Sequence, residues 1–399
     1  MALHKDDHAG SRTNLNSGCK RRRMIMERNF SWEELPSGVL ELIFSKLGVI
    51  EFLLMACVCK SWRAIIIAMM EQFMAKQGPP LAFYMSPNAR KYCYFYNLYE
   101  NRLYRASLPH LSGNKCIGYT CGYLVLVDST LGQKKPDIWL VNPFTRHELQ
   151  FPRPPKPYCN VILGALVNNP VSDFVAVAIS KLNPFLQFIR SGDAKWTCFE
   201  FHELKVEDEW RIVDAAIFQG KIYLLSNNGQ IGVLVLKSKI TKKPMVELLD
   251  VEKIQFTFNS ERRYCHIVTT PSELYVVEIS RCGVTFVMNR LDFETNKWET
   301  VKLKREILYF GKSSKSIALT IPKPYEIKKT RFLEGKGENW RIIGDGGGHV
   351  ARCFVGEGSL VESYDILLST PKHWKPDICI APPVWYFPHL AMTVDPVYG

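Results

Sequence analysis

The spacing of apolar residues near the start of the chain predicts three helices. Pro36 suits the first turn of a helix and Gly48 suits its end. Between these two positions apolar residues recur every third or fourth place and share one stripe, namely Val39, Leu40, Ile43, Phe44 and Leu47. A second short helix is expected from Phe52 to Ala56, and a third from Val58 to Met69.

From about Leu81 onward the apolar pattern changes from helical spacing to short β-rich runs. Such runs are bounded by turn residues, often glycine or Asn-Gly, and are typical of strands joined in hairpins. They include residues 122–128, 174–179, 220–225, 274–279 and 284–288.

A weak repeat runs through this β-rich part. The motif around Asn142 and Thr145 recurs around Asp292 and Thr295, so that the two threonines lie 150 positions apart. Trp196 and Trp298, each preceded by lysine, lie 102 positions apart. Both gaps are multiples of about 50, the period of kelch propellers. We therefore expect a β-propeller of about six blades, with a β-sandwich stack or an irregular barrel as open alternatives.

These patterns divide the chain of 399 residues into unequal parts. The expected organisation is a multidomain α plus all-β protein, because the length exceeds one small domain. We expect a disordered basic leader over 1–29, a helical domain over 30–75, a propeller over 81–390 and a tail over 391–399.

The formal net charge of +12 is spread along the chain. This distribution favours solubility over an acidic partner, and without a nucleic-acid-binding motif we expect no nucleic-acid partner. The one dense basic cluster runs from Lys20 to Arg23. It is either a nuclear import signal or part of a solvated leader, and the sequence leaves both open.

The N-terminal pattern, the apolar segments and the cysteines indicate the cellular compartment. The N-terminus has no apolar signal core, and Lys60 and Arg63 interrupt the best membrane candidate, residues 52–70. We therefore expect no membrane partner. The twelve cysteines are scattered without a CxxC pair, which indicates reduced thiols and no zinc site. The expected location is the nucleus, the cytoplasm or both.

Three motifs suggest chemistry but lack the context for it. The Gly311-Lys312-Ser313 run has Glu306 where a phosphate-binding loop needs glycine. Cys265 and His266 are neighbours on an expected strand and should point to opposite faces. The prolines over 152–157 suit a spacer between blades or a ligand of a proline-reading domain. We expect no catalytic, cofactor or metal residues.

The helical part carries more apolar surface than it can hide. Three helices in about 40 residues cannot bury all these faces among themselves. The surplus either meets a partner protein or packs against the β-rich unit, and the pattern alone does not decide between them.

Residues 30–70 resemble an F-box. The resemblance rests on the Leu35-Pro36 start, the apolar helix and the ending Val58-Cys59-Lys60-Ser61-Trp62-Arg63. It implies docking onto the Skp-family adaptor of a cullin ubiquitin ligase. The positions that match adaptor-contacting and core positions of the motif are Leu35, Pro36, Leu40, Ile43, Leu47, Val58, Cys59, Trp62 and Arg63.

The chain beyond residue 30 resembles plant F-box proteins with a C-terminal kelch-like domain of unknown function. The matching stretches are 117–128, 138–145, the strand after Gly220, 290–293 and 382–388. The resemblance implies a non-catalytic substrate-recognition subunit of an SCF-type E3 ubiquitin ligase, whose propeller binds an unspecified target protein.

An alternative from another class is a catalytic or small-ligand-binding propeller with an accessory helical arm. It would need titratable residues that converge on the central channel. The sequence offers no recognisable catalytic set for it.

Overall fold

The structure is a computed structural model of the whole chain. It describes residues 32, 35–77, 81–85, 92–97, 102–128, 138–166, 173–181, 183–201, 210–236, 244–259, 263–270, 272–280, 286–301, 306–311, 314–320, 350–357, 360–367, 384–386 and 396–397. The basic leader and the Lys20–Arg23 cluster lie outside the described residues.

Three helices precede the strands: α1 (Ser37–Phe44), α2 (Val49–Met55) and α3 (Lys60–Gln77). The prediction that the first helix reaches Gly48 was wrong. The backbone tightens after Phe44, where the Lys46 and Leu47 amides donate to carbonyls three residues back. Gly48 is extended and precedes α2, and its carbonyl accepts the Phe52 amide. Leu47 therefore lies in the turn between two helices.

The described strands form six separate sheets, the blades of a propeller. Five blades have four strands and blade 3 has five, and the strands pair antiparallel except for the fifth strand of blade 3, which pairs parallel. Blade 1 orders its strands β24-β1-β2-β3, blade 2 is β4 to β7, and blade 3 is β8 to β11. Their bounds are β1 (Leu81–Met85), β2 (Tyr92–Asn97), β3 (Arg102–Ser107), β4 (Asn114–Thr120), β5 (Tyr123–Asp128), β6 (Ile138–Val141), β7 (Glu148–Phe151), β8 (Asn160–Leu166), β9 (Phe174–Ile179), β10 (Phe185–Arg190), β11 (Thr197–Glu200) and β24 (Val384–Tyr386).

Blades 4 and 5 follow the same plan, and blade 6 departs from it. In blade 6 the order is β21-β20-β22-β23, so its second strand in sequence takes the innermost place. The bounds are β12 (Ile212–Phe218), β13 (Lys221–Ser226), β14 (Ile231–Val235), β15 (Met245–Leu248), β16 (Arg263–Thr269), β17 (Leu274–Ser280), β18 (Phe286–Asp292), β19 (Lys297–Val301), β20 (Glu306–Gly311), β21 (Ser314–Thr320), β22 (Val350–Glu357) and β23 (Leu360–Leu367).

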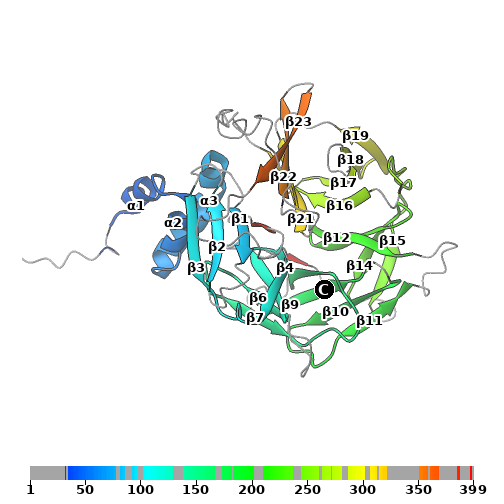
Figure 1. The fold of residues 1–399 in the computed structure, drawn as a ribbon, viewed down its shortest axis with the longest axis horizontal. Coiled ribbons are helices and arrows are strands. Elements are labelled where there is room, and N and C mark those ends of the chain that lie inside the picture. The colour runs from blue at the N-terminus through cyan, green and yellow to red at the C-terminus, as the bar shows by residue number, and fades with distance from the viewer. Residues whose placement is uncertain are drawn as a thin grey trace, which may run out of the picture.

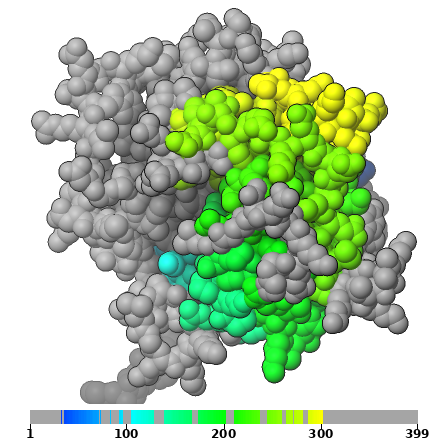
Figure 2. Space-filling view, turned by 90° about the vertical axis from the view of Figure 1, so that its right-hand side faces the viewer, coloured from blue at the N-terminus to red at the C-terminus, as the bar shows by residue number. Residues whose placement is uncertain are grey.

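The blades stand around a common centre (Figure 1). The innermost strands are neighbours in turn, from β4 through β8, β12, β16 and β21 to β24. The ring closes in blade 1, where β24 from the far end of the chain pairs antiparallel with β1. Figure 2 shows the flank of the ring away from the helices, where blades 3 to 5 run from green to yellow. The expected propeller of about six blades is confirmed.

Tight hairpins join the two innermost strands of a blade. Cys121 and Gly122 both have positive φ, as do Gln219 and Gly220 in blade 4. Positive φ at both central residues marks the type I′ turn, whose twist suits a two-residue hairpin. Glycine at the second position removes the steric cost there.

The repeat predicted between residues 142 and 292 extends to the hydrogen bonds. Oδ1 of Asn142 accepts the backbone N–H groups of Phe144 and Thr145 at 3.0 Å. Oδ1 of Asp292 accepts the Glu294 amide in the same way at 2.9 Å. Both turns join the two outer strands of a blade, in blades 2 and 5, so 150 residues correspond to three blades.

The two tryptophans of the repeat also take equivalent places. The indole N–H of Trp196 donates to the Pro152 carbonyl at 2.6 Å, and that of Trp298 donates to the Glu252 carbonyl at 2.8 Å. Each carbonyl lies just after the outermost strand of the preceding blade. The indoles therefore tie neighbouring blades together at the rim, and the proline-rich segment is a spacer between blades 2 and 3.

Candidate docking site

Helix α1 has apolar residues on two sides. Leu40 and Phe44 point inward and are 3% and 0% exposed. Val39 and Ile43 are each 41% exposed, and Leu42 is 67% exposed. The latter three lie at spacings of three and four and thus form one face of the helix. Two more exposed apolar residues follow at the end of α2 and beyond it, and we call the five together the open face: Val39, Leu42, Ile43, Leu54 and Val58.

The inward side holds the three helices together through aromatic contacts. Phe44 of α1 meets Trp62 of α3 edge to face, with ring centroids 5.3 Å apart. Phe52 of α2 stacks on Phe73 of α3 at 3.7 Å. Such pairs add to the free energy of burial, by roughly 0.5–1.5 kcal/mol each. The three helices are thus packed against one another by aromatic contacts.

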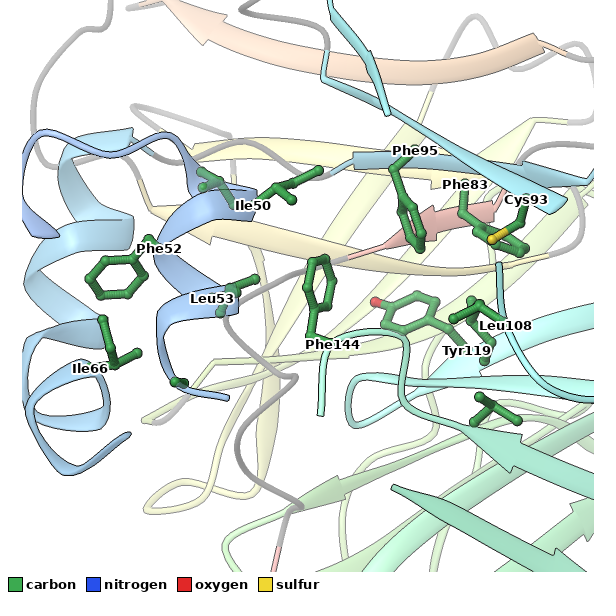
Figure 3. Packing of buried hydrophobic residues seen from close by; sticks show 14 of the residues in the cluster. Ile50, Phe52, Leu53, Ile66, Phe83, Cys93, Phe95, Leu108, Tyr119 and Phe144 are labelled. Atoms are coloured by element: carbon green, nitrogen blue, oxygen red, sulfur yellow. The ribbon is translucent and has the colours of Figure 1, made fainter. Parts of the chain in front are cut away.

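The helical core continues into blades 1 and 2. Buried residues of the helices and of these blades form one cluster, and Figure 3 shows Leu53 of α2 and Phe144 facing one another. Phe144 also lies 5.8 Å from Phe95 of β2, between ring centroids. The Cys57 thiol donates to the Phe144 carbonyl at 3.1 Å. We call the contact of Leu53 and Cys57 with Phe144 the seam.

The seam is placed by the turn between β6 and β7. Asn142 is buried, and its side chain holds the amides of Phe144 and Thr145. Arg146, with φ of 61°, completes the turn, and its guanidinium donates to the carbonyl of Ser107 at the end of β3. The turn is therefore tied to blade 1 on one side and carries the helices on the other.

Arg63 of α3 is exposed and acts electrostatically on Tyr123 of blade 2. Burial raises the pKa of the Tyr123 hydroxyl to about 12, and nearby Arg63 lowers it by a smaller amount. The same hydroxyl is hydrogen-bonded to Nδ1 of His147 at 2.8 Å. Arg63 thus sits within electrostatic range of blade 2.

The structure divides the nine residues taken from the motif. Leu40 is buried in the core. Four are partly buried and pack at the core or in the turns, namely Leu35, Leu47, Cys59 and Trp62. Four are exposed, namely Pro36, Ile43, Val58 and Arg63.

The large exposed apolar residues of the helices that were not predicted as site residues include Leu42, Leu54 and Ile67. Leu42 lies outside the stripe that runs through Leu40 and Phe44, so an apolar residue there was the available signal. Together with Val39 it makes the exposed side of α1 more apolar than the motif alone indicates.

The structure shows where described residues of the motifs that suggested chemistry lie. Cys265 packs in an apolar cluster between blades 4 and 5, while Nδ1 of His266 lies 3.3 Å from Oδ2 of Asp214. The two neighbours point to opposite faces, as expected. Gly311 and Ser314 pair at the ends of the antiparallel neighbours β20 and β21, and Lys312 and Ser313 lie outside the described residues.

Across the described part of the chain, no cluster of three or more His, Cys, Asp or Glu side chains has the arrangement of a metal site. None of the helices in this part has the length and apolar character that crossing a membrane requires.

Comparison with protein families gives two matches. Residues 95–332, well over half of the chain, match the sequence model of the KIB1-4 beta-propeller family. Residues 32–69 match that of the F-box domain. The second match covers the described helices up to the middle of α3, including the whole open face.

Individual relatives are distant. An F-box/kelch-repeat protein of Arabidopsis thaliana is 22% identical over 328 residues, which cover 76% of this chain and 79% of the relative. A functionally unknown protein from Desulfotomaculum acetoxidans aligns at 12% identity and a TM-score of 0.33, covering 72% of this chain and 95% of its own. AztD from Citrobacter koseri aligns at 11% identity and a TM-score of 0.32, and the alignment covers 61% of this chain and 63% of AztD.

Proposed function

The chain belongs to the KIB1-4 beta-propeller family and carries an F-box domain, and on that premise we propose that it is the substrate-recognition subunit of an SCF-type E3 ubiquitin ligase. The open face binds a Skp-family adaptor and, through it, a cullin. The propeller binds a target protein. The proposal places the protein in the nucleus, the cytoplasm or both, where its thiols stay reduced.

The open face is the observation that carries the proposal. Five large apolar side chains are left 41–67% exposed on a unit whose helices pack against one another and that also has a seam with the propeller. Three of them share one face of α1, and exposed apolar side chains grouped on a soluble domain mark an interaction surface more often than isolated ones do. Burying one such side chain completely is worth roughly 1.5–3 kcal/mol, so half-exposed residues still contribute about 1 kcal/mol each.

The seam supports a role in positioning. A substrate receptor of this kind breaks and forms no bonds, and its contribution is to hold target lysines near the charged ubiquitin carrier. That effect depends on geometry, because a linker that lets the two units move apart lowers the effective concentration. Here Leu53 and Cys57 pack directly on Phe144, so the helices have a fixed seat on the ring.

The test replaces one residue of the open face with a charge. Ile43→Asp should weaken binding of a purified Skp-family adaptor by roughly 30- to 1,000-fold, since about 2–4 kcal/mol is lost when a carboxylate faces an apolar partner. The matched control is Phe293→Asp on blade 5, because Phe293 is 43% exposed against 41% for Ile43. Binding is measured by calorimetry, and thermal unfolding of both variants confirms that they fold.

The expected outcome is a selective loss in Ile43→Asp with binding by Phe293→Asp unchanged. Adaptor binding that survives Ile43→Asp at full strength would contradict the assignment of the open face. Absence of binding by the unchanged chain would contradict the proposal as a whole.

A further inference from the structure

The innermost strand of blade 3 is the only one in the described part of the chain that carries a further strand on its inner side. β25 (Pro396–Val397) pairs parallel with the last residues of β8, in the register Pro396 to Ala165 and Val397 to Leu166. It also lies beside β13 of the next blade. Figure 1 shows the short red strands of this part of the chain inside the ring.

An innermost strand has one edge without a neighbouring strand, and its backbone groups there need partners. At Leu163 these partners are side chains of blade 2. Oγ1 of Thr120 accepts the Leu163 amide at 2.9 Å, and the Cys121 thiol donates to the Leu163 carbonyl at 3.2 Å. In blade 5 the Ile267 amide is accepted by Oδ2 of Asp214 at 3.0 Å.

Ala165 is the next residue on this edge. The Leu166 amide donates to the Asp173 carbonyl beside β9, and successive residues of a strand point their backbone groups to opposite sides. The N–H and C=O of Ala165 therefore face away from β9, as those of Leu163 do. Ala165 is buried, and β25 is the element that lies against its edge.

The hold of β25 on this edge is weak. It covers two residues, and Pro396 has no N–H to donate, so Val397 is the residue of β25 that can act as a backbone donor. A hydrogen bond of this type adds roughly 0.5–1.5 kcal/mol net. β25 belongs to the same chain as β8, and covalent linkage over a short connection can raise the effective concentration of a segment to the millimolar range.

We propose that the edge of β8 at Ala165 and Leu166 is a strand-acceptor site for an extended peptide, and that residues 396–397 fill it until a segment of the target protein displaces them. The site accepts a parallel, extended segment in which a proline precedes a β-branched apolar residue, because the chain itself presents Pro396 and Val397 there. The origin of the displacing segment in a target protein rests on the function proposed above.

The probe is a fluorescent peptide with the sequence of residues 391–399, titrated against three forms of the full chain. One form is unchanged, one lacks residues 391–399, and one carries Val397→Pro, which removes the donor of β25. The shortened chain and Val397→Pro should both bind the peptide, at least tenfold more tightly than the unchanged chain. Val397→Ile keeps the N–H and the β-branched side chain, and it should exclude the peptide as the unchanged chain does.

A peptide with proline in place of the valine should bind none of these forms. Hydrogen exchange of the segment that contains Ala165 should slow when the probe peptide binds to Val397→Pro. Equal binding to all forms, or no binding to either opened form, would overturn the strand-acceptor site. Titration of the same forms with the adaptor distinguishes the two proposals. Failure of the chain to bind the adaptor would contradict the proposed function, whereas failure of the opened forms to bind the peptide would contradict the strand-acceptor site.

Discussion

At the scale of residues, burial separates side chains that the sequence pattern places together. Leu40 and Ile43 lie on the same predicted stripe, yet Leu40 is in the core and Ile43 faces solvent. The stripe of a short helix spans more than 100°, so its two margins can meet different neighbours. Residue type and spacing predicted an apolar helix correctly, but which margin is covered depends on where α3 and blade 2 lie.

Cys93 offers a test of burial at one residue. It is fully buried in β2, and burial raises the pKa of its thiol from 9.0 to about 12. At pH 8 its thiolate is then roughly 1,000-fold rarer than that of a thiol with the ordinary value, and the thiolate is the reactive form. Iodoacetamide at pH 8 should therefore label the exposed Cys159 and spare Cys93, as peptide mass spectrometry would record. Equal labelling of both in the folded protein would contradict the packing of blade 1.

At the scale of elements, the same turn serves two purposes in two blades. In blade 5 the turn at Asp292 exposes Phe293 to solvent, whereas in blade 2 the turn at Asn142 buries Phe144 beneath the helices. The shared hydrogen bonds come from the repeat, and the different side chains adapt one copy to carry the seam. The sequence reveals the repeat but not which copy meets the helices.

The seam can be tested by truncating each phenylalanine. Phe144→Ala should lower the free energy of unfolding by about 3–5 kcal/mol, because a buried aromatic ring leaves a cavity shared by α2 and blade 2. Phe293→Ala in the equivalent turn should cost less than about 1 kcal/mol, since that ring is half exposed. Urea unfolding followed by tryptophan fluorescence measures both. Similar losses in the two variants would mean that the seam adds little.

The sequence predicted helices and hairpins well, but it did not predict which strands pair when they lie far apart in the chain. The hairpins, the period and the three helices follow from local pattern and turn chemistry. The pairing of β24 with β1 and of β25 with β8 does not, because each joins residues hundreds of positions apart through two or three backbone pairs. Residues 391–399 were expected to be a tail, and no pattern in the sequence indicated β25 within them. The domain boundaries at 30–75 and 81–390 stay predictions.

At the scale of the whole molecule, the ring depends on its last strands. Without β24 the sheet of blade 1 loses its innermost strand, and the edge of β1 opens toward the centre. An open edge in a closed ring removes contacts on both sides of the gap and invites pairing with other chains.

Two deletions test this closure. Removal of residues 380–399, which takes away β24 and β25, should lower Tm by roughly 5–10 °C, corresponding to several kcal/mol, and promote association. Removal of 391–399 alone should change Tm by no more than about 2–3 °C, because β25 contributes only two paired residues. Differential scanning calorimetry and light scattering record the two effects. Equal shifts from both deletions would show that β24 is not the closing strand.

We propose that the helical unit rests on the ring by the seam and offers its open face to an adaptor. Hydrogen exchange of the full chain with and without a Skp-family adaptor examines both parts of this proposal. We predict slower exchange in peptides that cover 37–44 and 49–58, and unchanged exchange across blades 3 to 5. Protection confined to the blades, or none in α1 at saturating adaptor, would contradict the account.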